Sequence, residues 1–436
     1  MTAPIPTGRF PVQRALDGDF CLTDAIAELG TSTATDARAM PGLPPALLAA
    51  NAWRLPFAPP PAIGAGDSGG PMLPTDDDAR LLHAVETSAL WRPPVAASVA
   101  GLTPPEALTW LHLAEHWIAV DAASDDHRYL NTACKLFGAT WTRYSTDTAW
   151  RQPQLTTQAA RVAYLLQQAT QRLTDQLANR RHPTDEPQNR PWIGSRPAAG
   201  RRGGRVVVLH GHGSAGATRL LHLAGQHGVP IAHVFSFTPE HDPGPAAEES
   251  AYASAWYPPS TPTDLAAPQP EAVKTVEVRG WAATERALAE AGADVVVLVG
   301  MPIVPEHVLT TARIGFVNAH NGSLPGYRGM DAVAWALINA GPITCTLHIA
   351  ATQVDAGAVL ASADVPAAPA ATLKDRVKQT QLQLLLHAAQ HVTTTGTLPP
   401  AAPQPTGGAR QFYRLHPHLK RILDRSPYTA IQGRPA

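Results

Sequence analysis

The chain has 436 residues, of which 44% are hydrophobic and only 16% are charged, a composition typical of a soluble globular protein rather than a disordered chain or a coiled coil. The 34 Lys and Arg residues balance the 35 Asp and Glu residues, so no net charge favours binding to nucleic acid or to a membrane. At this length we expect two domains with connecting segments.

Cysteine usage and hydropathy indicate the redox environment of the protein and whether it contacts a membrane. Cys21, Cys134 and Cys345 are too few and too scattered for a disulfide framework or a zinc site, which predicts a reducing, cytoplasmic environment and no metal site. The first residues lack the basic and apolar regions of a signal peptide. The longest apolar run, at residues 293–304, is shorter than the roughly 18 residues that a membrane helix needs, so no membrane partner is expected.

The first part of the chain predicts a mainly helical domain, residues 1–181, with an irregular first 75 residues. Asp76 to Asp78 can cap a helix that starts at "ARLLHAVETSALW". "PPEALTWLHLAEHWIAVDAA" begins with prolines that suit a first helical turn. Residues 156–181 place apolar side chains near one helix face and end in basic residues. The Pro-, Arg- and Gly-rich residues 182–204 predict a linker.

Beyond the linker the pattern changes to short β-branched runs separated by helix-like stretches. This alternation predicts a Rossmann-like, doubly wound α/β sheet over residues 205–413, followed by a C-terminal tail at 414–436. "TCTLHIAAT" and "AVLASADV" flank "QVDAG" with too little chain for a crossover helix, so they should pair antiparallel and make the sheet mixed. The parallel runs are residues 205–209, 231–237, 274–278, 294–300 and 316–320.

The first strand leads into a glycine turn. Gly211, Gly213 and Gly216 fit the G-x-G-x-x-G pattern of a dinucleotide site in the required strand-to-helix position. Such a site also needs an acidic residue at the end of the second strand, and here the nearest acid, Glu240, lies past it. A tight turn that requires small residues therefore explains the pattern equally simply, and a nicotinamide-dependent oxidoreductase stays as an alternative function.

A second candidate site begins at "FVNAHNGSLPGYRG", residues 316–329. Asn318 and His320 are two apart on a strand and so leave the same face. If the strand that begins at Thr344 lies beside them, Asp355 in the following turn can reach His320. An amide that donates to an oxyanion, a proton-carrying imidazole and an orienting carboxylate suit acyl transfer to an amine, which needs no side-chain nucleophile. Each of the three residues, taken alone, could equally be an ordinary strand end or turn.

The order and spacing of these parts resemble the formyltransferases that use N10-formyltetrahydrofolate, a family that includes glycinamide ribonucleotide, methionyl-tRNA and sugar N-formyltransferases. The resemblance rests on Asn-x-His, the "LPGYRG" loop and the later His348, Asp355 and Gly357, and it spans about residues 205–413. It implies that Asn318, His320 and Asp355 are catalytic. It also implies that main-chain groups of Met301, Pro302, Ile303, Val304, Gln353 and Val354 hold the folate. On the acceptor side we expect His348, Gly211, His212, Gly213, Ser214, Tyr327 and Arg328.

The departures from the family pattern point to the acceptor. His320-Asn321-Gly322 replaces the common His-Pro-Ser, and few residues follow the match where the methionyl-tRNA branch has another domain. The N-terminal helical half has no counterpart in the glycinamide ribonucleotide formyltransferase of ordinary purine synthesis. The resemblance therefore implies formyl transfer to an amine of a small molecule in natural-product or sugar biosynthesis. Another one-carbon or carbamoyl-like transfer, a non-catalytic binding module and a homodimeric assembly stay open.

Overall fold

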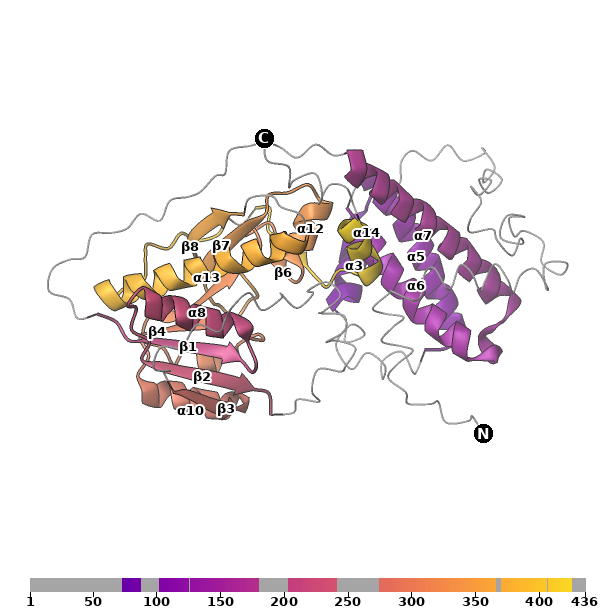
Figure 1. The fold of residues 1–436 in the computed structure, drawn as a ribbon. Coiled ribbons are helices and arrows are strands. Elements are labelled where there is room, and N and C mark those ends of the chain that lie inside the picture. Colours follow the sequence, from indigo (N-terminus) through magenta and orange to yellow (C-terminus); the bar gives the residue numbers. More distant parts are fainter. Residues whose placement is uncertain are drawn as a thin grey trace. The chain divides into compact units, whose positions relative to one another are not determined.

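The computed structural model describes residues 73–87, 102–124, 126–179, 203–240, 274–365, 370–405 and 407–425 (Figure 1). The chain divides into two compact units. A helical unit comprises residues 1–180 and 414–427, and an α/β unit comprises residues 181–413 and 428–436. Almost all of the predicted irregular segment and of the predicted linker lies outside the described residues.

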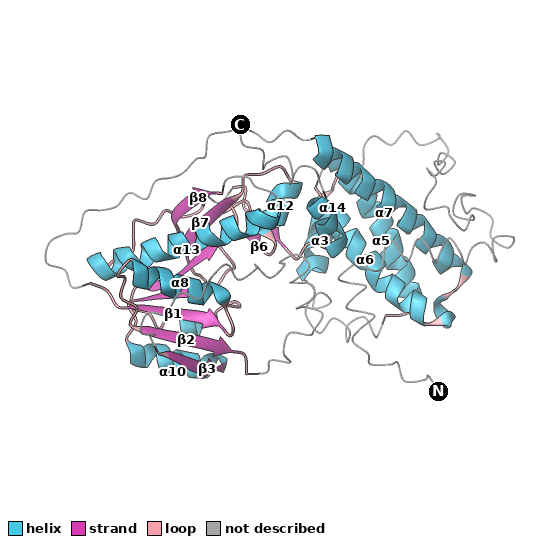
Figure 2. Cartoon of the chain, viewed as in Figure 1, coloured by secondary structure: helices cyan, strands magenta, loops and turns pink. Residues whose placement is uncertain are grey.

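The helical unit is held together by three long helices that pack on one another, α5, α6 and α7. Sequence patterns predicted α3, α5 and α7 but not α6. The cap of α3 is Thr75, one residue before the predicted position: its Oγ1 accepts from the Asp78 N–H at 3.1 Å, and Asp78 Oδ2 accepts from the Thr75 N–H at 3.0 Å. The described elements of the unit are α3 (Asp76–Thr87), α5 (Pro104–Ser124), α6 (Arg128–Thr146), η5 (Thr148–Trp150), α7 (Pro153–Asn179) and α14 (Pro417–Arg425) (Figure 2).

The segment expected as a C-terminal tail instead returns to the helical unit. Its helix α14 packs against α7 and buries Leu419 and Leu423, which are four residues apart and so share one helix face. Asn131 on α6 fixes the entry to this helix: its side chain donates to the Arg414 carbonyl at 3.3 Å and accepts from the His416 N–H at 2.6 Å. The prediction of a tail was therefore wrong for the described residues 414–425.

The α/β unit is built on a seven-stranded sheet with the order β3-β2-β1-β4-β5-β7-β8. The strands from β3 to β5 are parallel, whereas β7 is antiparallel to both β5 and β8, so the prediction of a mixed, doubly wound sheet is confirmed. The strands are β1 (Val206–Gly211), β2 (His233–Thr238), β3 (Thr275–Arg279), β4 (Val295–Val299), β5 (Gly315–His320), β7 (Thr344–Ile349) and β8 (Val359–Asp364). A separate two-stranded pair joins β6 (Arg328–Gly329) to β9 (Gln411–Phe412).

Helices cover both faces of the sheet, which explains why its central strands are continuously apolar (Figure 1). On one face α8 and α13 pack against each other and α13 crosses the strands from β1 to β8. On the other face α10 and α11 cover a core that includes Val207, Leu209 and Phe316. The helices are α8 (Ala215–Gln226), α10 (Gly280–Ala291), α11 (Glu306–Leu309), α12 (Ala332–Ile338) and α13 (Ala370–Thr395). None of the helices in the described parts of the chain is both long and apolar enough to cross a bilayer.

Candidate active site

The glycine turn and the loop after β4 meet at the point where the strand order of the sheet reverses. β1 and β4 are neighbours there, and ligands of open α/β sheets bind beyond the carboxyl ends of such strands. Gly211 lies so close to Gly300 that an added Cβ would come within 2.6 Å of the Gly300 carbonyl oxygen. Gly213 has a φ of +70°, and Ser214 caps α8 by accepting from the Ala217 N–H at 3.3 Å. Only small residues allow this close approach.

The end of β2 carries no acidic side chain. The strand stops at Thr238, and Glu240 lies beyond it beside the main chain of Gly280, where an added Cβ would be 3.3 Å from the Glu240 carboxylate. A nicotinamide dinucleotide bound at the glycine turn would therefore lack the strand-end carboxylate that usually holds its ribose.

The pairing of β5 with β7 places two histidines and an asparagine on one side of the sheet. Asn318 lies opposite His348 and His320 lies opposite Thr346 in the antiparallel register. The Asn318 Nδ2 atom is 3.3 Å from His348 Nε2. The expected neighbourhood of the "TCTLHIAAT" strand and the "FVNAH" strand is thus present.

Asp355 reaches this group because its turn is held in an uncommon conformation. The Ala356 N–H donates to the Gln353 carbonyl at 3.2 Å, and Asp355, inside this turn, has a φ of +51°. Asp tolerates this left-handed region better than most residues. Gly357 follows, and an added Cβ there would lie 1.8 Å from the Ile349 carbonyl oxygen, so no side chain fits. The turn therefore folds back onto the end of β7 and carries the carboxylate with it.

The Asp355 carboxylate lies between the two imidazoles. Its Oδ2 accepts from the Gly329 N–H at 2.9 Å and lies 3.4 Å from His320 Nδ1. Its Oδ1 lies 3.4 Å from His348 Nε2. Both imidazoles are almost fully buried, with 6% and 2% of their side chains exposed. We call His320, Asp355 and His348 the proton cluster.

The hydrogen bonds of the imidazoles define where their protons lie. His320 Nε2 is 2.6 Å from the Tyr327 carbonyl and His348 Nδ1 is 3.0 Å from the Ile349 carbonyl. A carbonyl oxygen only accepts, so both of these nitrogens carry hydrogen. In the neutral imidazoles the nitrogens that face Asp355 are then lone pairs, each turned toward a carboxylate oxygen. A proton added to one of these nitrogens would convert its repulsive contact with the Asp355 oxygen into a charge-assisted hydrogen bond.

Burial and neighbouring charges oppose each other at these groups. Burial lowers the pKa of His320 below its ordinary value of 6.5, and the attraction of Asp355 and the hydrogen bond to Tyr327 offset this only in part. Burial raises the pKa of the Asp355 carboxyl, but a hydrogen bond from His348 and the charge of His320, both in the protonated imidazoles, and the Gly329 N–H outweigh it, so the net pKa is lowered. Burial therefore favours a neutral His320, whereas an ionised Asp355 favours its protonation.

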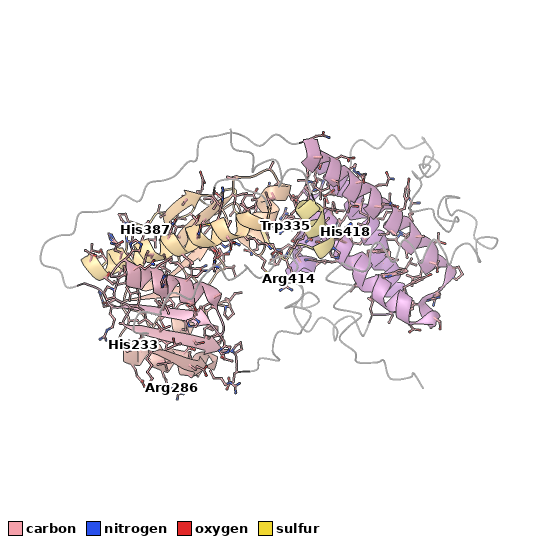
Figure 3. All side chains as sticks on the ribbon, viewed as in Figure 1. His233, Arg286, Trp335, His387, Arg414 and His418 are labelled. Atoms are coloured by element: carbon pink, nitrogen blue, oxygen red, sulfur yellow. The ribbon has the colours of Figure 1, made fainter. Side chains whose placement is uncertain are left out.

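Tyr327 and Arg328, which we expected on the acceptor side, contact residues from later segments of the α/β unit. The Tyr327 ring stacks on Phe412, with centroids 5.3 Å apart, and lies over Gly341, which has no room for a Cβ beneath it. The Arg328 guanidinium donates to Gln404 Oε1 at 2.7 and 3.1 Å. The same region is anchored by buried Trp335 on α12, labelled in Figure 3, whose Nε1 donates to the Tyr413 carbonyl at 2.8 Å.

The residues expected to hold the folate lie in the segment that follows β4 and in the turn that carries Asp355. Ile303 is 68% exposed, an unusual position for an isoleucine, whereas Val304 is buried in the core and can offer only its main chain. Pro302 has no N–H to donate. Among the described hydrogen bonds, none is made by the N–H groups of Ile303 or Val354. An apolar side chain next to free main-chain donors fits a flat ring with an amide-like edge.

Two polar residues of the site were not identified from the sequence. Gln404 donates from Nε2 to the carbonyls of Asp355 and Gly357, at 2.7 and 2.8 Å. Thr346 on β7 donates to the Gly322 carbonyl at 2.7 Å and so holds the loop that follows β5. Within the described parts of the chain, no group of three or more His, Cys, Asp or Glu side chains is arranged to bind a metal ion.

The fold and the site together define a doubly wound α/β domain with an amide beside a buried His–Asp–His cluster. Residues 205–389 match the family model described as Formyl transferase. The α/β unit thus contains a formyl transferase domain, which confirms the family resemblance. The residues of the helical unit lie outside the match.

Curated relatives match part of this chain. The methionyl-tRNA formyltransferase of Deinococcus radiodurans is 34% identical over 136 residues, which cover 31% of this chain and 42% of the relative. That of Acidothermus cellulolyticus is 32% identical over 149 residues, 33% of this chain and 45% of the relative. The chain therefore spans less than half the length of these relatives.

Solved structures of similar proteins include two formyltransferases. Phosphoribosylglycinamide formyltransferase from Streptococcus pneumoniae is 19% identical, with a TM-score of 0.30, and the match covers 42% of this chain and 96% of that one. A sugar N-formyltransferase from a Shewanella species is 16% identical, with a TM-score of 0.34, and the match covers 50% of this chain and 87% of that one.

Proposed function

We propose that the protein transfers a formyl group from N10-formyltetrahydrofolate to the amine of a small-molecule acceptor. The observation that carries the proposal is the proton cluster: a carboxylate between two buried imidazoles, beside the amide of Asn318. N10-formyltetrahydrofolate supplies an activated formyl carbon that an amine can attack directly. The rest of the chemistry belongs to side chains of this chain.

Asn318 donates a hydrogen bond to the formyl oxygen, which becomes negative when the amine attacks the formyl carbon. The amide nitrogen has two hydrogens, and one of them is directed at His348 Nε2 over a long 3.3 Å contact. The other is left for an oxyanion. A preorganised donor of this kind typically contributes about 3 kcal/mol to the transition state.

The proton cluster accepts the proton that the attacking amine must lose as its new bond to carbon forms. Neutral His320 can take that proton, directly or through a water, at the Nδ1 atom that faces Asp355. The carboxylate then stabilises the imidazolium that results. His348 lies on the other oxygen of Asp355 and offers a second position for the same proton. The proton finally reaches the nitrogen that leaves the formyl carbon as its bond breaks.

The acceptor is proposed to be a small amine used in natural-product or sugar biosynthesis. The balance of 34 basic and 35 acidic residues supports a small acceptor over a transfer RNA, because binding the phosphate backbone relies on an excess of basic side chains. The relatives described as methionyl-tRNA formyltransferases make charged transfer RNA the alternative acceptor. The same domain could also carry a different one-carbon or carbamoyl-like group.

The experiment supplies the full chain and N10-formyltetrahydrofolate to separate panels of amino sugars, amino acids and methionyl-tRNA. We expect one small amine to gain the mass of a formyl group and the folate to be released as tetrahydrofolate. Asn318→Ala should abolish most of this gain. Asn339→Ala is the matched control, because Asn339 lies at the end of α12 outside the site.

The outcomes separate the alternatives. Formylation of methionyl-tRNA alone would replace the proposed acceptor but keep the chemistry. Tight NADH binding without folate binding would overturn the proposed function and favour the oxidoreductase alternative.

A further inference from the structure

Gln404 joins two catalytic segments that are far apart in the sequence. Its side-chain oxygen accepts from the Arg328 Nε and Nη2 atoms at 3.1 and 2.7 Å. Its side-chain nitrogen donates to the Asp355 and Gly357 carbonyls at 2.7 and 2.8 Å. Arginine only donates and carbonyls only accept, so the orientation of this amide is unambiguous and all four of its hydrogen-bonding positions are used.

The three residues after Gly326 each hold a different part of the site. The Tyr327 carbonyl accepts from His320, the Arg328 side chain donates to Gln404, and the Gly329 N–H donates to Asp355. Because Gln404 in turn donates to the Asp355 main chain, the hydrogen bonds form a closed ring through Arg328, Gly329, Asp355 and Gln404. This ring fixes two segments relative to each other: the loop with the Tyr327 carbonyl, which accepts from His320, and the turn that carries Asp355.

Gln404 is itself anchored on both sides. Ala402 pairs with Val359 through two main-chain hydrogen bonds of 2.8 Å, immediately after the Asp355 turn. Further on, the Arg410 carbonyl accepts from the Arg328 N–H at 3.0 Å, and β9 pairs with β6. The segment around Gln404 therefore spans from the strand after Asp355 to the loop after His320. A rigid anchor of this kind is what a precisely spaced site requires.

The ring of hydrogen bonds holds Asp355 in an uncommon backbone conformation. With a φ of +51° this residue lies in the left-handed region, which is unfavourable for most residues, so neighbouring contacts must hold it there. The two donations from Gln404 fix the peptide planes that follow Asp355 and Gly357. Without them the turn could relax and move the carboxylate away from both imidazoles.

We propose that Gln404 is a positioning residue that sets the spacing between Asp355 and His320 for proton transfer. It acts through the ring formed with Arg328 and touches neither substrate. This inference rests on the proposed function for its kinetic consequence, but the spacing itself can be measured without any reaction.

The test compares Gln404→Ala and Gln404→Glu with Gln390→Ala, which changes an exposed glutamine on α13 outside the ring. Gln404→Glu keeps the acceptor for Arg328 but loses both donations to carbonyls, so it isolates that half of the ring. We expect both Gln404 variants to lose about 10- to 100-fold in kcat with KM changed less than threefold. Gln390→Ala should behave like the native protein.

Two further readouts distinguish positioning from simple loss of folding. In the Asp355→Asn background, Gln404→Ala should cost little additional kcat, because both changes act on one carboxylate. NMR titration of His320 should show a lower pKa in Gln404→Ala, because the charge that raises it has moved away. The groups facing His320 in this titration are Asp355, His348 and the Tyr327 carbonyl.

The possible results are decisive. Native kcat per folded molecule, additive losses in the double variant, or an unchanged His320 titration would overturn the positioning role. If the native protein transferred no formyl group, the proposed function would fail, and the His320 titration would still decide the role of Gln404.

Discussion

Replacing Asp355 with Asn removes the negative charge of the proton cluster and little else. Asn also tolerates the left-handed conformation, which has a φ of +51° here, and its side-chain oxygen can still accept from the Gly329 N–H. The protein should therefore fold. What is lost is the charged partner of His320, at 3.4 Å from Nδ1, when that imidazole takes up a proton.

The size of the loss follows from the contacts. A hydrogen bond to a charged group contributes about 1.5 to 3 kcal/mol, and the imidazolium has no other carboxylate among its described partners. A loss near the upper end of this range, made only in the transition state, corresponds to a decrease in kcat of about 100-fold. A larger loss would indicate that the His348 side of the carboxylate also contributes. KM should change little, because Asp355 is proposed to act after binding.

Initial rates of formyl transfer, measured by mass spectrometry of the product, would check this at several pH values. Native kcat should persist below pH 6.5, because burial lowers the pKa of His320 and keeps it neutral there. In Asp355→Asn the acid limb should move to still lower pH, because a charge that raises this pKa is gone. Asp364→Asn is the control, since Asp364 accepts from Thr344 on β7 away from the site. A kcat for Asp355→Asn within threefold of native would refute the reasoning.

Three further changes test other parts of the molecule. Asn318→Ala should lower kcat by about 10²- to 10³-fold at nearly constant KM, and a rise in KM alone would show a binding role instead. Gly322→Ala should lower both the melting temperature and kcat, because the new Cβ would lie 2.6 Å from the Tyr327 carbonyl and 2.7 Å from His320 Nε2; native values in both assays would contradict this. Burial raises the pKa of Glu86 to about 7 from 4.5, so its contribution to stability is full below pH 4.5 and is lost as the pH rises through 7. Glu86→Gln should therefore remove a decline of about 3 kcal/mol in the unfolding free energy of the helical unit, and an unchanged pH dependence in urea unfolding would count against it.

Local sequence patterns were enough to predict the sheet and the proximity of Asn318, His320 and Asp355. The strand expected at residues 316–320 is β5, and the short connection between residues 344–352 and 358–365 correctly implied an antiparallel pair. The two-residue repeat of a strand placed Asn318 and His320 on one face, and the assumed pairing of residues 344–352 with residues 316–320 placed Asp355 near His320. Their catalytic roles stay a prediction. These features depend on interactions between segments that are neighbours in the sheet.

Features that depend on distant contacts were not predictable. Gln404 lies between Pro403 and Pro405 in a stretch without periodicity, and its importance arises only from Arg328 and Asp355. Arg328 was expected on the acceptor side from the family resemblance, and nothing in the sequence indicated its contact with Gln404. The helix α14 is short, so its apolar repeat was too brief to outweigh the expectation of a tail.

The return of the chain to the helical unit sets an order of events during synthesis. Asn131 finds its main-chain partners 283 and 285 residues later, at Arg414 and His416. The ribosome must therefore release residues 181–413 before α14 can join α7, so the helical unit is incomplete until then. The entropic cost of so long a closure grows only with the logarithm of the loop length, and a folded insert shortens the effective loop further. Residues 181–413, which contain the formyl transferase match, thus lie between two parts of one helical unit, and α14 joins a unit that was begun first.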